Sequence, residues 1–366
     1  MSRKTVLVAG ATGLVGNAAL AHFATEPDTD VIAVSRRQPA KLHGAHFISV
    51  DLQDHAQSAA VFAALPDVTH VVYAALYEMP DLVAGWSNER QIEINDRMLR
   101  NLMEPLLGAA PNLQHITLLQ GTKAYGSHVR PMQYPAREHR SEARDVPNFY
   151  WNQEDYIRER LRAQPSPQAC AFTIFRPVLI VGYSLGAAMN LVPAIGVYAA
   201  MLKERGEPLH YPGGPARASQ AVDAGVLARA MAWAGRTEAA RNETFNIANG
   251  DIFAWPHVWP ALCDQLGMPP GAHRPLSLAN DIAPREDEWQ TIVDRHGLIA
   301  PDLKSFVGLS FEYADYQMGF GRTTPAPVSY SSTIKLMQAG FHEVMDTEVM
   351  FKKALQDFQI ERLLPP

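Results

Sequence analysis

The sequence predicts an α/β protein in which a doubly wound parallel sheet is followed by a smaller, more irregular C-terminal region. Short apolar runs alternate with helical patterns through the first half of the chain, which is typical of parallel strands joined by crossover helices. The runs are nearly continuous in Val, Ile and Leu, which indicates strands that are buried on both faces. A glycine-rich turn with Gly10, Gly13 and Gly16 follows the first run. These three observations favour a twisted parallel sheet with helices on both faces.

The elements can be placed in order along the chain. Six strands are expected at residues 5–9, 31–34, 47–50, 70–74, 115–119 and 171–181, with helices between them, notably at residues 14–25, 91–107 and 150–161. A helix at residues 220–234 and a strand at residues 243–247 look like a return to the sheet. We therefore expect residues 1–183 and 215–252 to form the sheet domain. Residues 184–214 and 253–366 would form a cap over its open edge.

Composition and charge exclude several classes of protein. The chain has 366 residues, of which 47% are hydrophobic and 19% charged, with a net charge of −6, an ordinary composition for a globular chain of about two domains. No cation surplus is available for a phosphate backbone, so nucleic acid is disfavoured as a partner. Cys170 and Cys263 are the two cysteines, too few for a disulfide framework, which favours a reducing, cytoplasmic location.

Two segments imitate membrane or export signals. Residues 177–202 carry no charge and exceed the roughly 20 residues that cross a bilayer. Prolines, glycines and polar residues interrupt the segment, so we expect a buried strand and a buried helix, and no membrane partner. Arg3 and Lys4 precede an apolar run as in a signal peptide, but glycines interrupt that run too. No metal site is expected, because His43 and His46 lack carboxylate or thiolate support.

The segment Gly10-Ala11-Thr12-Gly13-Leu14-Val15-Gly16 joins the first expected strand to a helix. This is the context of a dinucleotide-binding fingerprint of the Rossmann type. Glycines let the turn tighten, so that a pyrophosphate can lie on the helix N-terminus, where N–H groups and the helix dipole favour an anion. An ordinary tight turn is the alternative.

The end of the second expected strand bears on which dinucleotide is bound. An acidic residue there would bind the ribose hydroxyls of NAD, but the sequence has Ser35-Arg36-Arg37. Guanidinium groups suit a 2′-phosphate, so the sequence predicts NADPH, with a solvated basic turn as the alternative. Asp51 and Leu52 are expected at the adenine. The small Ala74 and Ala75 would let the cofactor approach closely.

A nicotinamide enzyme that acts on a carbonyl needs a proton donor at the oxygen, commonly a phenol tuned by an ammonium group. Short-chain dehydrogenases usually carry this pair as Tyr-x-x-x-Lys. In this chain no Tyr has Lys four positions later, since Tyr150 is followed there by Glu154 and Tyr156 by Arg160. What stands in its place is Leu119-Gln120-Gly121-Thr122-Lys123-Ala124-Tyr125-Gly126, together with Asn148-Phe149-Tyr150-Trp151-Asn152-Gln153-Glu154-Asp155.

These motifs resemble the progesterone 5β-reductase and iridoid synthase-like family of atypical, extended short-chain dehydrogenases. The resemblance extends to residues 69–73, 95–101 and 175–184, and more loosely to residues 246–250 and 339–341. It implies that Lys123 and Tyr150 are catalytic. It further implies that NADPH gives hydride to the β-carbon of an enone, while Tyr150, tuned by Lys123, stabilises the enolate oxygen. The remaining cofactor-binding positions would be Gln120, Gly121, Pro177, Val178 and Ile180.

The chain also departs from the family pattern near the expected substrate. Ala124 replaces a His, Ser127-His128-Val129-Arg130 replaces a Gly-Pro-Phe segment, and Trp151 stands at a second aromatic position. Steroid or monoterpene specificity therefore does not transfer. Cap residues that are candidates for the pocket are Met189, Trp255, Phe311, Tyr313 and Met318.

Three other functions stay open. Gly182-Tyr183-Ser184-Leu185-Gly186 matches the nucleophile elbow of a serine hydrolase, but a hydrolase would leave the glycine turn and the arginine pair unexplained. The chain could instead be a non-catalytic NADPH-binding module. It could also reduce a ketone or aldehyde directly, or oxidise an alcohol. In the enzymatic cases the substrate is a small enone or carbonyl compound, and a homodimer stays open as the oligomeric state.

Overall fold

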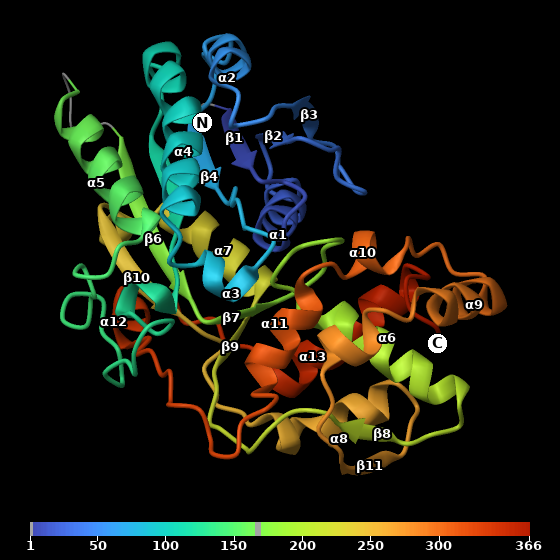
Figure 1. Cartoon of the computed structure of the whole chain (residues 1–366). Helices are drawn as coiled ribbons and strands as arrows, with labels where there is room; N and C mark the ends of the chain where they lie inside the picture. Colours follow the sequence, from blue (N-terminus) through green and yellow to red (C-terminus); the bar gives the residue numbers. More distant parts are fainter. Residues whose placement is uncertain (1–2, 165–169) are drawn as a thin grey trace. The chain divides into compact units, whose positions relative to one another are not determined.

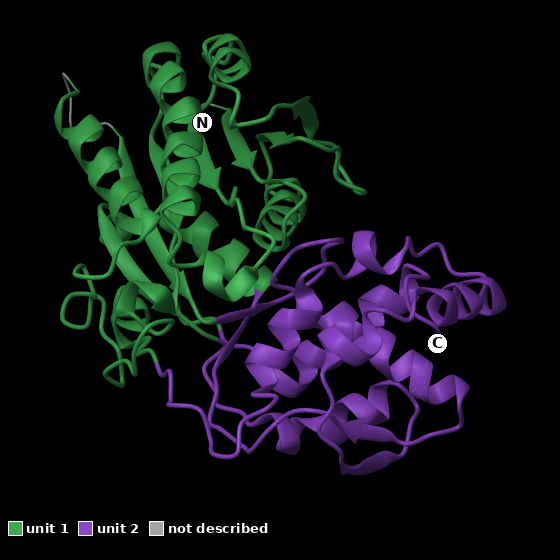
Figure 2. Cartoon of the chain, viewed as in Figure 1, with its two compact units in different colours: residues 1–178, 224–248, 331–343 green, residues 179–223, 249–330, 344–366 purple. Residues whose placement is uncertain are grey.

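The computed structural model describes residues 3–164 and 170–366, which fall into two compact units (Figure 2). Unit 1 comprises residues 1–178, 224–248 and 331–343, and unit 2 comprises residues 179–223, 249–330 and 344–366. This division differs from the expected one: unit 1 ends at residue 178 and resumes at residue 224, and it includes residues 331–343, which the sequence assigns to the cap.

Unit 1 is built around a seven-stranded sheet in which every pairing is parallel (Figure 1). The order across the sheet is β10-β6-β5-β4-β1-β2-β3, which confirms the predicted doubly wound parallel sheet. The strands are β1 (Lys4–Ala9), β2 (Thr29–Ser35), β3 (His46–Ser49), β4 (His70–Tyr73), β5 (His115–Leu119), β6 (Ala171–Pro177) and β10 (Glu243–Ile247).

Two groups of helices cover the sheet (Figure 1). In one group α1 (Leu14–Phe23) packs against α7 (Ala224–Ala234); in the other, α4 (Glu89–Ala109) packs against α2 (His55–Phe62) and α5 (Phe149–Arg162). Strands β4 and β6 are buried along their whole length, as covering on both faces requires. Unit 1 also contains the short helices α3 (Leu82–Gly85), η1 (Thr122–Tyr125), η2 (Glu238–Ala240) and α12 (Ile334–Gln338).

Two predicted elements are wrong in detail. The strand expected at residues 171–181 is interrupted at Val178: β6 stays in the main sheet, whereas β7 (Leu179–Val181) pairs with β9 (Ala221–Asp223) in a separate two-stranded sheet. Pro177 has no N–H group with which to extend the ladder. The helix expected at residues 220–234 begins only at Ala224, because the residues before it form β9. A short apolar run does not distinguish a strand from a helical turn.

Unit 2 is mostly helical. Its longest apolar segment, α6 (Leu191–Glu204), is buried from Leu191 to Leu202 and packs against α9 (Glu286–His296), α11 (Ser310–Met318) and α13 (Thr347–Ile360). The charge-free stretch at residues 177–202 therefore contains the short strand β7 and the buried part of helix α6. Among the described residues, no helix combines the length and apolarity needed to cross a membrane. The remaining elements are β8 (Leu209–Tyr211), α8 (Trp255–Gln265), β11 (Pro270–His273), η3 (Leu278–Ile282) and α10 (Leu303–Phe306).

The topology marks one place in unit 1 where a ligand is expected. The chain order reverses at β1, which lies between β2 and β4. Ligands of open α/β sheets bind outside the carboxyl ends of the strands at such a switch point. The segments that follow β1, β4, β5 and β6 at this edge are the ones that carry the candidate site residues.

Candidate active site

The glycine turn after β1 is tightly built. Gly10 has φ +83°, in the left-handed region, and a Cβ there would lie 2.6 Å from both the Ala74 carbonyl oxygen and the Ala75 nitrogen. A Cβ on Gly16 would lie 2.1 Å from the Gly10 carbonyl oxygen. These two glycines therefore let the turn, the end of β4 and the start of α1 approach closely.

Gly13 is in a different situation. It is the N-cap of α1, where it offers no side chain to the first-turn N–H groups, and a Cβ would meet a single neighbour, the Gly10 carbonyl oxygen, at 3.3 Å. The first N–H groups of a helix have no partner within the helix. The turn thus leaves a helix N-terminus uncovered by side-chain capping, which fits the pyrophosphate cradle expected of residues 10–16.

Ser35, Arg36 and Arg37 lie where β2 ends. Ser35 Oγ donates to the Arg37 carbonyl oxygen at 2.6 Å, and Ser49 Oγ donates to that of Arg36 at 3.1 Å. The backbone of the turn is therefore fixed, while the two arginine side chains are exposed. Next to β2, the Asp51 carboxylate accepts from the Gln53 N–H at 3.0 Å and Leu52 is buried.

Lys123 lies in η1, immediately after β5. Its ammonium group is 3.7 Å from the centre of the Trp86 ring, a cation–π contact. Burial lowers the pKa of Lys123 to about 8, and the carboxylate of Glu78 opposes that shift. Burial also raises the pKa of Glu78, which accepts a hydrogen bond from Gln91 Nε2 at 2.8 Å. Lys123 is therefore close to the neutral range in which acid–base groups are most useful.

Tyr150 lies in the first turn of α5 and is 9% exposed. Its N–H donates to Oδ1 of Asn148, the helix N-cap, at 3.1 Å. A Cβ on Gly121 would lie 3.4 Å from the Tyr150 hydroxyl and 3.5 Å from the Pro177 carbonyl oxygen. The phenol therefore reaches the segment after β5 that also carries Lys123, and Ala124 of that segment packs in one cluster with Tyr150.

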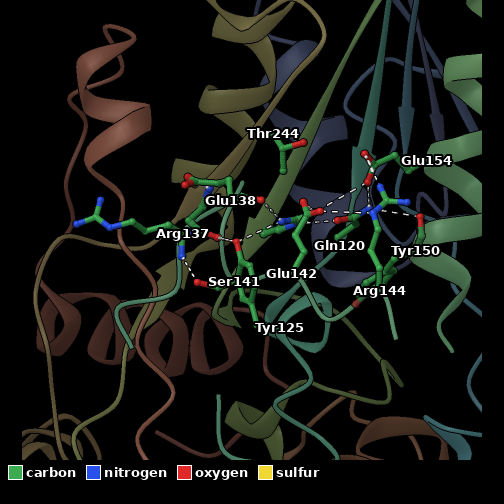
Figure 3. A network of polar contacts seen from close by, with 12 residues as sticks. Gln120, Tyr125, Arg137, Glu138, Ser141, Glu142, Arg144, Tyr150, Glu154 and Thr244 are labelled. Atoms are coloured by element: carbon green, nitrogen blue, oxygen red, sulfur yellow. Dashed lines mark hydrogen bonds and ion pairs between the residues drawn. The ribbon is translucent and has the colours of Figure 1, made fainter. Parts of the chain in front are cut away.

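A polar network connects to the backbone of this tyrosine (Figure 3). Its centre is Arg176 of β6, whose side chain is fully buried. Sequence reasoning missed this group, although a charged residue within an apolar strand is a visible signal. Arg176 Nε donates to Gln120 Oε1 at 2.7 Å, and Nη2 donates to Glu142 Oε1 at 2.7 Å. Gln120 Nε2 in turn donates to the Tyr150 carbonyl oxygen at 3.3 Å and to Glu154 Oε2 at 3.1 Å.

The contacts of the network distinguish Tyr125 from Tyr150. The Tyr125 hydroxyl donates to Asn246 Oδ1 at 2.6 Å and accepts from Arg176 at 3.4 Å. Burial raises the pKa of Tyr125 to about 12. The Tyr125 hydroxyl is thus held within the buried network, and its raised pKa does not favour a role in proton transfer. Glu154, which takes the place of the lysine of the usual motif, is 3% exposed and paired with Arg144 and Arg158.

The other predicted positions fall in both units. Pro177 and Val178 lie at the end of β6, and the Val178 N–H donates to the Ile247 carbonyl oxygen at 3.4 Å. Ile180 belongs to β7 in unit 2. Unit 2 also holds all the candidate pocket residues, which are Met189, Trp255, Phe311, Tyr313 and Met318. All of these except Met189 are buried.

Ser184 of the hydrolase-like motif also lies in unit 2. The residue is 2% exposed, and its Oγ accepts a hydrogen bond from Asn190 Nδ2 at 3.2 Å. A nucleophile elbow would instead expose the serine hydroxyl at the top of the sheet. The geometry therefore does not favour the hydrolase.

Comparisons with known proteins show which family this chain resembles. The family model described as NAD dependent epimerase/dehydratase matches residues 6–248. An (S)-8-oxocitronellyl enol synthase of Nepeta racemosa is 32% identical over 80% of this chain and 76% of its own length. The 3-oxo-Delta(4,5)-steroid 5-beta-reductase of Arabidopsis thaliana is 32% identical over 86% of this chain and 82% of its own length.

The fold is also found among solved structures. The UDP-N-acetylglucosamine 4-epimerase of Methanobrevibacter ruminantium M1 superposes with a TM-score of 0.67, at 15% identity, over 99% of this chain and 100% of the epimerase chain. At this identity the likeness shows the fold alone.

Proposed function

This chain belongs to the NAD dependent epimerase/dehydratase family, and we propose that it is an NADPH-dependent reductase of the conjugated double bond of enones. The observation that supports this most strongly is that the Tyr150 hydroxyl lies beside Gly121. Gly121 belongs to the segment after β5 that also carries Lys123. Two relatives with more than 30% identity bear names that describe an enol product and a 3-oxo-Δ4,5 steroid, which is a conjugated enone.

The cofactor supplies a hydride when bound, and this chain's residues hold it for delivery. Gly10, Gly13 and Gly16 form the turn that accommodates the pyrophosphate on α1. Arg36 and Arg37 would bind the 2′-phosphate. Asp51 and Leu52 would hold the adenine, and the small Ala74 and Ala75 would give room at the switch point. Thr12, Leu14 and Val15 complete the turn, while Gln120, Gly121, Pro177 and Val178 would hold the nicotinamide end.

Tyr150 and Lys123 act on the substrate carbonyl. As a hydride adds to the β-carbon, negative charge builds on the carbonyl oxygen, and the Tyr150 hydroxyl donates a hydrogen bond to that oxygen. The ammonium group of Lys123 favours the phenolate and so helps Tyr150 release its proton. The oxygen that takes this proton belongs to an enol; addition of a solvent proton at the α-carbon, with return of the hydroxyl proton to Tyr150, then gives the saturated ketone. Donors aimed at the developing charge lower the barrier more than they strengthen substrate binding.

Transfer of deuterium tests this proposal. NADPH labelled with deuterium at the transferred position should place the label on the β-carbon of an enone substrate. Tyr150→Phe keeps the ring and removes the hydroxyl, so kcat should fall by about 10²–10³, the usual scale for one oxyanion donor. Label at the carbinol carbon would instead identify a 1,2-carbonyl reductase. A protein that binds NADPH but does not consume it with a panel of enones and ketones would be a binding module.

A further inference from the structure

Arg176 has no expected contact with substrate or cofactor, yet it is the most heavily bonded side chain near the site. Its guanidinium bonds to Gln120, Glu142, the Tyr125 hydroxyl and the carbonyl oxygen of Glu138. A buried charge costs free energy unless its partners are held in good geometry. The network therefore fixes one arrangement of the segments after β5 and before α5.

Arg176 determines which way the Gln120 amide points. Nε donates to the amide oxygen at 2.7 Å, and a guanidinium cannot accept a hydrogen bond. The oxygen end of the amide must therefore face Arg176. The NH2 end faces α5, where it donates to the Tyr150 carbonyl oxygen and to Glu154 Oε2.

The segment Gln120–Gly121 meets Tyr150 at two places. The Gln120 side chain bonds to the Tyr150 backbone carbonyl at 3.3 Å, and the Tyr150 hydroxyl lies against Gly121, 3.4 Å from where a Cβ of that residue would be. Asn148 fixes the third point, the Tyr150 N–H. We propose that Gln120 and Arg176 are positioning residues that hold the first turn of α5, so that the Tyr150 phenol stays at Gly121. This inference rests on the proposed function and adds the residues that set its geometry.

A double exchange of the amide and the acid isolates the proposed contact. Gln120→Glu with Glu154→Gln keeps the net charge, the side-chain sizes and a hydrogen bond between the two positions. Position 120 still accepts from Arg176 but no longer has a donor for the Tyr150 carbonyl. Misplacement of a catalytic group by about 1 Å costs up to 10²-fold in rate. We expect kcat for an enone to fall about tenfold, with the KM for the enone and the melting temperature close to those of the wild type.

Arg158→Met is the matched control. Arg158 bonds to Oε1 of Glu154, at 2.9 Å, whereas Gln120 bonds to Oε2. The control removes a guanidinium from the same carboxylate without breaking the path from Arg176 through Gln120 to Tyr150. It should therefore keep the wild-type kcat. An equal loss in the control would mean that kcat responds to the charge around Glu154, which would overturn the proposal.

A second measurement does not depend on turnover. Tyrosine labelled with ¹³C at Cζ, assigned through Tyr150→Phe, should give a sharp Tyr150 resonance in the wild type and a shifted or broadened one in the exchanged variant. If the variant with the Gln120–Glu154 exchange keeps the wild-type kcat, or has a lower kcat with an unchanged Tyr150 resonance, the proposal is overturned. If the wild-type protein reduces no enone, the proposed function fails on its own. In that case the Tyr150 resonance alone tests the positioning proposal, and a resonance that is unchanged in the exchanged variant overturns the proposal.

Discussion

The three glycines of the turn after β1 differ in what they are needed for. Gly16 has no room for a Cβ, which would lie 2.1 Å from a backbone oxygen, whereas Gly13 has one neighbour at 3.3 Å. Fold requirements therefore account for Gly16. They account for Gly13 less fully, because a contact at 3.3 Å needs a shift of only a few tenths of an ångström, and the proposed reason for its missing side chain is an approaching pyrophosphate.

Substituting these glycines separates the two reasons. Gly13→Ala should fold, losing at most about 1 kcal/mol as a poorer N-cap, while NADPH binds at least about tenfold more weakly because the methyl group occupies the cradle. Gly16→Ala should lower the melting temperature sharply, since backbone must move. Calorimetric titration with NADPH and thermal unfolding measure the two effects. Unchanged NADPH affinity in folded Gly13→Ala would contradict the cradle.

The charge beside Lys123 predicts a change in pH dependence. The carboxylate of Glu78 raises the pKa of Lys123 against the effect of burial. Glu78→Gln should therefore lower this pKa below about 8, the wild-type value. If catalysis needs the ammonium form, the alkaline limb of the kcat profile moves to lower pH.

The pH profile of kcat, measured for both proteins, tests this expectation. Glu89→Gln is a charge-matched control, because Glu89 is an exposed acid in the first turn of α4. Its profile should coincide with that of the wild type. A profile of Glu78→Gln that also coincides with the wild type would show that the proton on Lys123 does not limit turnover.

At the scale of elements, the turn after β2 should set the choice of cofactor. Its backbone is held by the two serine hydroxyls, so the exposed Arg36 and Arg37 side chains can be removed with little effect on stability. Loss of a charged partner of a phosphate costs about 1.5–3 kcal/mol, or roughly 10–100-fold in affinity. Replacing both arginines by Ala should weaken NADPH binding by this factor and leave NADH binding unchanged. Equal affinity of the wild type for both cofactors would refute the assignment.

Elements that depend on continuous burial could be predicted from the sequence. The strands β1, β2, β4 and β5 were expected within two residues of their observed ends, because short runs rich in Val and Ile that alternate with helical patterns are typical of a buried parallel sheet. The break at Val178 and the strand β9 could not be predicted. Both depend on pairing in a second sheet, which local periodicity does not encode.

The site was partly predictable for a similar reason. The Gly10–Gly16 turn and the absence of Tyr-x-x-x-Lys are local patterns, so sequence alone indicates them. The roles of Gln120, Glu142 and Arg176 arise from segments far apart in the chain that meet around one guanidinium. Glu154 shows the limit clearly. The sequence marks it as a missing lysine, and the structure shows a buried acid neutralised by arginines.

At the scale of the whole molecule, the described groups of the proposed chemistry are concentrated in unit 1. This unit holds the glycine turn, the arginine turn, Lys123, Tyr150 and the Arg176 network. The resemblance to the progesterone 5β-reductase and iridoid synthase-like family is confirmed by relatives that match about 80% of the chain or more.

The stability of unit 1 should depend on two buried histidines. His70 in β4 and His115 in β5 are 7% and 3% exposed, and their ring centres are 6.2 Å apart. Thr173 Oγ1 donates to the Ala240 carbonyl and must accept from His115 Nε2, at 2.9 Å, so that nitrogen carries the proton of a neutral ring. Burial lowers the pKa of His70 to about 4 and that of His115 to about 3.

The sign of the pH effect follows from these values. The unfolded chain binds a proton at each histidine near pH 6.5, whereas the folded chain does not, so their stabilising contribution is complete above about pH 6.5 and is lost as the pH falls toward 4. Each histidine should add about 1.4 kcal/mol per pH unit to the loss within that window. His115→Gln keeps an N–H donor for Thr173 and cannot take up a proton. Its free energy of unfolding, measured with urea from pH 7 to 5, should therefore decline less steeply than that of the wild type. Parallel curves for the two proteins would mean that His115 is protonated in the folded state.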